Sequence, residues 1–145
     1  MPKYVLDTNL IISRKFDPSR PPETTYYSSI VLFELMTASN NLREFRSYQA
    51  AWKEAKKSNR LIVPTEADWS SASRISYLLA QERKQQASGK APKLTSKVKQ
   101  EIALDCLLAV TAAREGVTVL TLNKYDFNAI RRHCKNLIVM QYPPK

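Results

Sequence analysis

The sequence predicts an α/β fold in which helices cover a central parallel sheet. Short apolar runs rich in β-branched residues alternate with longer segments of helical periodicity along the 145 residues. Parallel strands need long crossover connections, so this alternation favours a parallel sheet. The sequence contains no internal repeat and no long linker. We therefore expect a single domain over residues 1–145.

Cap and turn residues divide the first half of the chain into short elements. Asn41 and Glu44 have capping-box spacing, Ser29 suits the start of a helix, and Pro64 ends the run RLIVP. Three prolines between residues 18 and 22 indicate a stiff loop. The expected strands are 3–7, 26–28 and 60–64, and the expected helices are 10–15, 30–39 and 41–58.

The second half of the chain contains the two longest helical patterns. Thr65 and Asp68 suit the opening of a helix over 66–86, and Gly116 suits the end of an amphipathic helix over 98–115. Residues 87–97 form a polar loop between them. Strands are expected at 117–122 and 136–140, with a short helix at 127–134 between them.

Composition excludes several classes of protein and of site. The longest apolar runs are far shorter than the roughly 20 residues that cross a bilayer, and no signal peptide follows Met1, so we expect no membrane association. Two cysteines build no disulfide framework, which favours the cytoplasm. The single histidine excludes a two-histidine ribonuclease and a histidine-rich zinc site. Two glycines cannot build a phosphate-binding loop.

The net charge of +10 indicates an anionic partner. A nucleic acid, an acidic protein and a membrane surface each fit such a charge, and composition does not choose among them.

Four acidic or polar regions stand where such residues are unusual. Asp7 follows the first apolar run, Glu34 lies inside IVLFELM, and Asp105 lies inside EIALDCLLAV, one helical turn after Glu101. Thr121, Asn123 and Asp126 follow the run VTVL. Each region also has a simpler interpretation. Asp7 would cap a helix, and the last region would be a turn followed by a helix cap. Glu34 and Asp105 would form salt bridges or belong to a polar stripe that faces water.

If the acids converge, they predict a cation site. Ligands of parallel sheets gather at the carboxyl ends of the strands, where Asp7 is expected. Converging acids repel one another unless a cation neutralises them, and oxygen ligands without His or Cys favour Mg²⁺ or Mn²⁺. An acidic pocket in a basic protein fits a phosphate-containing substrate, because Lys and Arg hold the phosphates while metal ions in the pocket activate a water and stabilise the charge that develops on the phosphate.

The chain resembles the PIN-domain nucleases, in particular the VapC-type toxins. The resemblance lies in the order and spacing of four regions: DTN, FEL, Asp105 in a late helix, and TLNKYDF. The resemblance implies a three-layer α/β/α sandwich on a central parallel sheet. It implies Asp7, Glu34 and Asp105 as metal ligands and catalytic residues, with Thr8 orienting the first acid. The fourth catalytic position falls on Asp126 or Asn123, and the remaining supporting residues are Asn9, Glu101 and Thr121.

The resemblance also implies a function and partners. It implies an endoribonuclease that uses Mg²⁺ or Mn²⁺, and the toxin of a type II toxin–antitoxin pair, with RNA, a small antitoxin protein and a second copy of the chain as partners. The alternatives are a housekeeping RNA-processing or DNA-acting nuclease, and a degenerate RNA-binding module. Basic residues near the Asp105 helix and the last turn are candidate RNA contacts, or parts of a solvated loop: Lys90, Lys93, Lys97 and Lys124.

Overall fold

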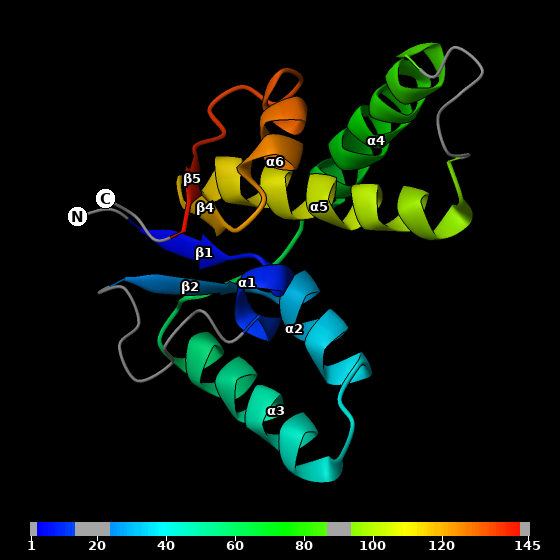
Figure 1. Cartoon of the computed structure of the whole chain (residues 1–145). Coiled ribbons are helices and arrows are strands. Elements are labelled where there is room, and N and C mark those ends of the chain that lie inside the picture. Colours follow the sequence, from blue (N-terminus) through cyan, green and yellow to red (C-terminus); the bar gives the residue numbers. More distant parts are fainter. Residues whose placement is uncertain (1–2, 14–23, 87–93, 143–145) are drawn as a thin grey trace.

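The chain forms a five-stranded parallel sheet in a computed structural model that describes residues 3–13, 24–86 and 94–142 (Figure 1). The strand order is β3-β2-β1-β4-β5, and every paired neighbour is parallel. The strands are β1 (Tyr4–Leu6), β2 (Thr25–Ser28), β3 (Leu61–Ile62), β4 (Thr118–Thr121) and β5 (Val139–Gln141). The parallel sheet expected from the sequence is confirmed.

Six helices connect these strands within the described residues. They are α1 (Thr8–Ile12), α2 (Ser29–Thr37), α3 (Leu42–Lys57), α4 (Glu66–Gln86), α5 (Ser96–Glu115) and α6 (Lys124–Arg131). Three of the expected caps are present. The Asn41 side chain accepts a hydrogen bond from the Glu44 amide, Thr65 and Asp68 cap α4 reciprocally, and Gly116 ends α5 at φ 69°.

Several helix boundaries differ from the sequence prediction, and capping residues explain three of them. Thr95 caps α5, so this helix begins at Ser96 and not at residue 98. Ser28, not Ser29, caps α2, because the Ser28 hydroxyl accepts the Ile30 amide at 3.1 Å. Asn123 caps α6, so this helix begins at Lys124 and not at residue 127. The first helix begins at Thr8, two residues before the expected start, and residues 14–15 of its expected span lie outside the described residues.

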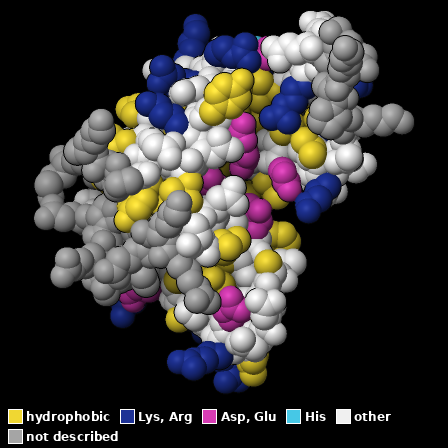
Figure 2. Space-filling view, viewed as in Figure 1, with side chains coloured by type: hydrophobic (Ala, Val, Ile, Leu, Met, Phe, Trp, Pro, Cys, Tyr) yellow, Lys and Arg dark blue, Asp and Glu magenta, His cyan; other side chains and the backbone are white. Residues whose placement is uncertain are grey.

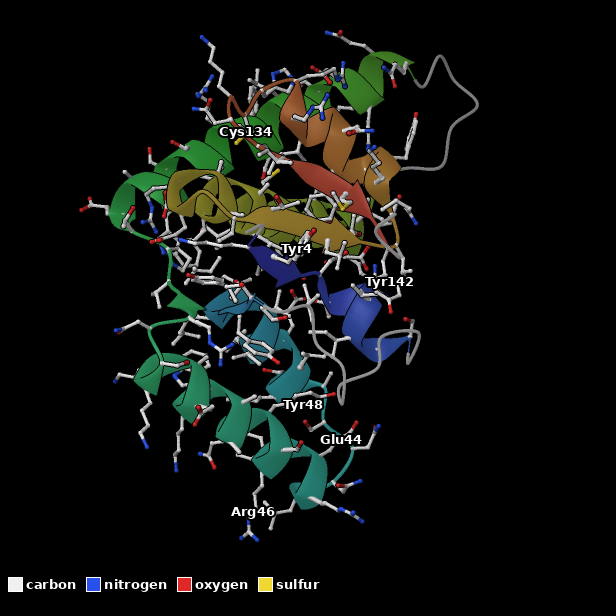
Figure 3. The ribbon with its side chains drawn as sticks, turned by 90° about the vertical axis from the view of Figure 1, so that its left-hand side faces the viewer. Tyr4, Glu44, Arg46, Tyr48, Cys134 and Tyr142 are labelled. Carbon is white, nitrogen blue, oxygen red and sulfur yellow. The ribbon has the colours of Figure 1, made fainter. Side chains whose placement is uncertain are left out.

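Both faces of the sheet are covered. Alternate residues of a strand point to opposite faces, and the two clusters of buried residues follow this rule. Val5 and Val119 lie in the larger cluster with residues of α2, α4, α5 and α6, whereas Leu6 and Leu120 pack against Leu10 of α1. Figure 3 shows α3, with Arg46 and Tyr48, at one end of the molecule and Cys134 at the other, with the strands between them. This is the expected three-layer α/β/α arrangement.

The sheet topology places a binding edge between β1 and β4. From β1 the chain proceeds to β2 and β3 on one side, and then returns to β4 and β5 on the other. The crevice at such a reversal, beyond the carboxyl ends of the strands, is where ligands of parallel sheets bind. Among the described residues, no helix has the length and apolar character needed to span a bilayer.

Candidate functional site

Asp7 lies at the carboxyl end of β1 and is held by the neighbouring strand. Its side chain is 4% exposed and accepts a hydrogen bond from the Thr121 hydroxyl of β4 at 2.9 Å. Asp7 occupies the N-cap position of α1, yet its side chain makes no capping hydrogen bond, so the simple cap interpretation is wrong. Burial raises the pKa of Asp7, the bond from Thr121 opposes that rise, and the charge of Asp126 adds to it.

Glu34 reaches the same region from α2. The Thr8 hydroxyl donates a hydrogen bond to the Glu34 carboxylate at 3.2 Å and so joins the segment after β1 to α2. The hydroxyl was expected to orient the first acid, but it serves Glu34, and only the Thr8 backbone hydrogen-bonds to Asp7. Glu34 is half-buried, whereas its neighbour Phe33 is 61% exposed, so Glu34 is not part of a water-facing stripe. Burial raises the pKa of Glu34, with the bond from Thr8 opposing and the charges of Asp7 and Glu101 adding.

Asp105 and Glu101 project from α5 toward the same region. No Lys or Arg among the described residues forms an ion pair with Asp105 or Glu34, and the salt-bridge interpretation therefore finds no support there. Burial, followed by the negative charges of the other acids in the region, raises the pKa of Asp105 to about 8. Asp105 and Glu101 line the same cleft as Asp7, Glu34 and Asp126, where like charges repel one another.

The fourth region forms a short relay of hydrogen bonds. The Asn123 amide N–H donates to the Thr121 hydroxyl at 2.9 Å, and the Asn123 side-chain Nδ2 donates to the Asp126 carboxylate at 2.6 Å. Asn123 also caps α6 by accepting the Asp126 amide at 3.4 Å. Both residues are therefore at the site, with the neutral Asn123 orienting the charged Asp126.

These side chains line one open cleft of about 390 Å³. Figure 2 shows the acidic side chains gathered in the middle of one face, with Lys and Arg side chains on the side toward α4 and α6. Five of the lining residues are acids. The lining residues are Asp7, Thr8, Asn9, Ile12, Glu34, Glu101, Asp105, Asn123, Asp126 and Phe127.

The sequence-derived set is thus largely brought together. Thr121 lies behind the cleft wall and bonds to Asp7. Lys97 and Lys124 are exposed but line neither this cleft nor the cavity beside it. Lys90 and Lys93 lie outside the described residues.

The donor types of the cleft fit a hard divalent cation. Carboxylates and an amide, without His or Cys, are the ligands that Mg²⁺ and Mn²⁺ take. In the described part of the chain, no three Asp, Glu, His or Cys side chains surround one point closely enough to hold an ion.

A second cavity of about 180 Å³ adjoins the cleft, and the sequence did not point to it. It shares Glu101, Asp105 and Asp126 with the cleft and extends between α4, α5 and α6. One available signal was Tyr125, an aromatic residue within the polar turn NKYDF, which is 83% exposed. The other residues of this cavity are Leu79, Glu82, Arg83, Gln86, Val98, Ile102, Ala129, Ile130 and Arg132.

Comparison with known proteins identifies the fold. No protein-family profile and no curated protein sequence matches the chain. A chain of the DNA-bound VapBC structure from Salmonella typhimurium matches with TM-score 0.58 at 19% identity, over 97% of this chain and 98% of that one. A chain of FitAB bound to an IR36 DNA fragment matches with TM-score 0.55 at 20% identity, over 95% and 94%.

This chain has a PIN-like fold. A third match, to VapBC-1 from nontypeable Haemophilus influenzae, has TM-score 0.54 at 19% identity and covers 95% of this chain and 96% of that one. The coverage near full length on both sides means that the PIN-like fold accounts for the whole strand and helix order. The fold that the sequence resemblance implied is confirmed.

Proposed function

We propose that this chain is an endoribonuclease that depends on Mg²⁺ or Mn²⁺, and the toxin of a toxin–antitoxin pair. The observation that carries the proposal is the cleft that five acidic residues line, at the switch point of the sheet, in a chain of net charge +10. Acids that share a cleft repel one another, and a bound cation would neutralise that repulsion. The basic remainder of the surface attracts a polyanion. The fold shared with VapBC and FitAB supports the choice of a toxin.

Within the cleft the protein's own residues have distinct roles. Asp7, Glu34 and Asp105 would hold the metal, and Asn9, Glu101 and Asp126 complete the polar wall. The Thr121 hydroxyl donates a hydrogen bond to Asp7, and the Thr8 hydroxyl donates one to Glu34. Both bonds favour the ionised carboxylates and oppose the effect of burial. A bound metal ion would lower the pKa of a water molecule and stabilise negative charge on the phosphate. Hydrolysis by water leaves 5′-phosphate and 3′-hydroxyl ends.

The proposed partners follow from the fold and from exposed apolar side chains. VapBC and FitAB are complexes, and some of them are bound to DNA. By analogy we propose a small antitoxin that covers the cleft, and a homodimer. Phe33 and Leu42 are exposed on α2 and α3 and offer apolar surface for such contacts. Cys106 and Cys134 are free thiols, consistent with the reducing cytoplasm that we propose as its location.

Cleavage of a labelled single-stranded RNA tests the function directly. We expect cleavage with Mn²⁺ or Mg²⁺, none with EDTA, and 5′-phosphate ends on the products. Asp7→Asn and Asp105→Asn should abolish cleavage while leaving most RNA binding, since basic residues supply most of the phosphate affinity. Glu54→Gln is the matched control, because Glu54 is exposed on α3 and lines neither cavity.

Other outcomes support the alternatives. Undiminished cleavage in EDTA would contradict the metal mechanism. Binding of RNA by the wild-type protein without cleavage under any divalent metal would indicate a degenerate RNA-binding module. Cleavage without growth arrest on induction of the wild-type gene would favour a housekeeping nuclease.

A further inference from the structure

The cavity beside the acid cleft has the composition of a nucleotide-binding subsite. Its inner wall contains the buried apolar side chains Leu79, Ile102 and Ile130. Its outer wall contains an exposed aromatic ring, Tyr125, and the cation Arg83. An apolar floor with an aromatic and a guanidinium at its rim is how proteins bind an unpaired base and its phosphate.

Tyr125 is not held by other described parts of the protein. Its side chain is 83% exposed, and no hydrogen bond involving its hydroxyl is present among the described residues. It is the first-turn neighbour of Asp126, which lines both the cleft and the cavity. The ring therefore borders the second cavity, next in sequence to a residue that the two spaces share, and is available to stack on a ligand.

The cavity contains two arginines, and only one of them, Arg83, has no acidic partner in the described part of the chain. Arg132 is paired with Glu82 at 3.0 Å, and His133 contacts the same carboxylate at 2.7 Å. Arg83 forms no such pair with a described residue. The charge of Glu82 is thus offset by Arg132, and Arg83 stays available for a phosphate.

The size of the cavity limits what it accepts. About 180 Å³ is smaller than the roughly 300–1,000 Å³ of pockets for drug-sized ligands. A single base fits this description better than a folded RNA element. Because Asp105 and Asp126 are shared, a nucleotide in the cavity would place its neighbouring phosphate over the acid cleft.

We propose that this cavity binds the nucleotide next to the scissile phosphate of a single-stranded RNA, with Tyr125 stacking on its base and Arg83 contacting its phosphate. The inference rests on the proposed ribonuclease function, since the acid cleft defines which phosphate is scissile. It adds a subsite that positions the substrate, and Tyr125 and Arg83 are binding residues without a part in the chemical step.

Binding of a short fluorescent oligoadenylate tests the subsite without requiring cleavage. The measurement uses the full-length Asp105→Asn protein, in which we expect cleavage to be absent and one repulsive charge is removed. Adding Tyr125→Ala should weaken binding by about 5- to 150-fold, the range for loss of one stacked base. Tyr125→Phe should bind nearly as well as the parent, because the ring is kept.

Matched controls separate stacking from general effects. Tyr77 is also an exposed tyrosine on a helix, at 63%, and lines neither space, so Tyr77→Ala should leave binding unchanged. Arg83→Gln should weaken binding and reduce its salt dependence, whereas Arg74→Gln, also on α4 and outside both spaces, should not. Melting temperatures of all variants should match the parent, since these side chains are exposed.

The outcomes distinguish this subsite from the nuclease function. Equal binding by the Tyr125→Ala and parent proteins would overturn the subsite, even if the wild type cleaves RNA. Equal losses for Tyr125→Ala and Tyr77→Ala would overturn it as well. Tyr125-dependent binding in a protein whose wild type never cleaves RNA would uphold the nucleotide site and refute the nuclease. Absence of any oligoadenylate binding would overturn the subsite, and the cleavage assay of the wild type would decide the nuclease function separately.

Discussion

Replacing Asp105 with Asn should stabilise the metal-free protein at alkaline pH. The substitution removes one of the converging charges at nearly constant volume. Burial and the neighbouring acids raise the pKa of Asp105 to about 8 from the ordinary 3.8. An acid whose pKa is raised in the native state holds its proton there while the unfolded chain has lost it. Stability is therefore full below the unfolded pKa and is lost as the pH rises toward 8.

The size of the effect follows from the same pKa difference. Each pKa unit corresponds to about 1.4 kcal/mol, so the whole rise at Asp105 corresponds to at most about 6 kcal/mol. The asparagine amide in a half-buried position costs roughly 1–3 kcal/mol. We expect a net gain in unfolding free energy of about 2 kcal/mol near pH 8. For a chain of this size, that gain raises the melting temperature by about 5 °C.

The assay is thermal unfolding in EDTA at several pH values, repeated with Mn²⁺. In EDTA the mutant should exceed the wild type near pH 8, and its advantage should shrink as the pH falls toward the ordinary value of 3.8, below which Asp105 is protonated in both the native and the unfolded state. Excess Mn²⁺ should stabilise the wild type by about 2.7 kcal/mol at a hundredfold excess over Kd. The mutant should gain less, so the order of melting temperatures should reverse.

The control is Glu54→Gln, which removes an exposed charge from α3. It should change neither the pH profile nor the response to Mn²⁺. A mutant at Asp105 that melts below the wild type at every pH, and that responds equally to Mn²⁺, would show that Asp105 is a structural residue. The convergence of acids would then not explain its environment.

Three further predictions concern other parts of the molecule. Thr121→Val should lower the unfolding free energy by about 1–3 kcal/mol and reduce RNA cleavage, whereas Thr121→Ser should retain both, as denaturant unfolding and a cleavage assay would show. Arg114→Met should destabilise the protein by about 2 kcal/mol, measured by urea unfolding, because it leaves the buried Asp68 unpaired; unchanged stability would refute that role. The native protein should copurify with a small partner and run as a dimer on size exclusion after the partner is removed, and a monomer at micromolar concentration would contradict the proposed homodimer.

The sequence predicted the part of the site that depends on strand ends. Asp7 and Asn123 each follow an apolar run, and the carboxyl ends of parallel strands necessarily share one edge of the sheet. The placement of Glu34 and Asp105 required more than periodicity, because a helix with apolar residues all round does not show which face is inward. The apolar surroundings of Glu34 and Asp105 marked both acids as unusual, but only the family resemblance implied that they meet at one site.

Features that depend on contacts between distant segments could not be predicted. Asp68 was expected only to open α4, but it also pairs with Arg114, 46 residues later, at 2.8 Å. The cavity beside the cleft depends on how α4, α5 and α6 pack, and no local pattern specifies that packing. The role of Asn123 was left open because one polar side chain both caps a helix and orients Asp126, and only its contacts show this.

The hydroxyl of Thr121 has a consequence for sequences related to this one. It has a single proton, which it gives to Asp7, and it accepts the backbone N–H of Asn123. Among the other side chains, only serine has a hydroxyl at the same distance from the backbone that both donates and accepts a hydrogen bond. Position 121 is therefore a diagnostic for relatives: one with valine or alanine there would have a buried first acid without its donor, and that acid would more readily keep its proton. Reading this one position, together with the aspartate at position 7, would predict which relatives keep the donor that favours an ionised first acid.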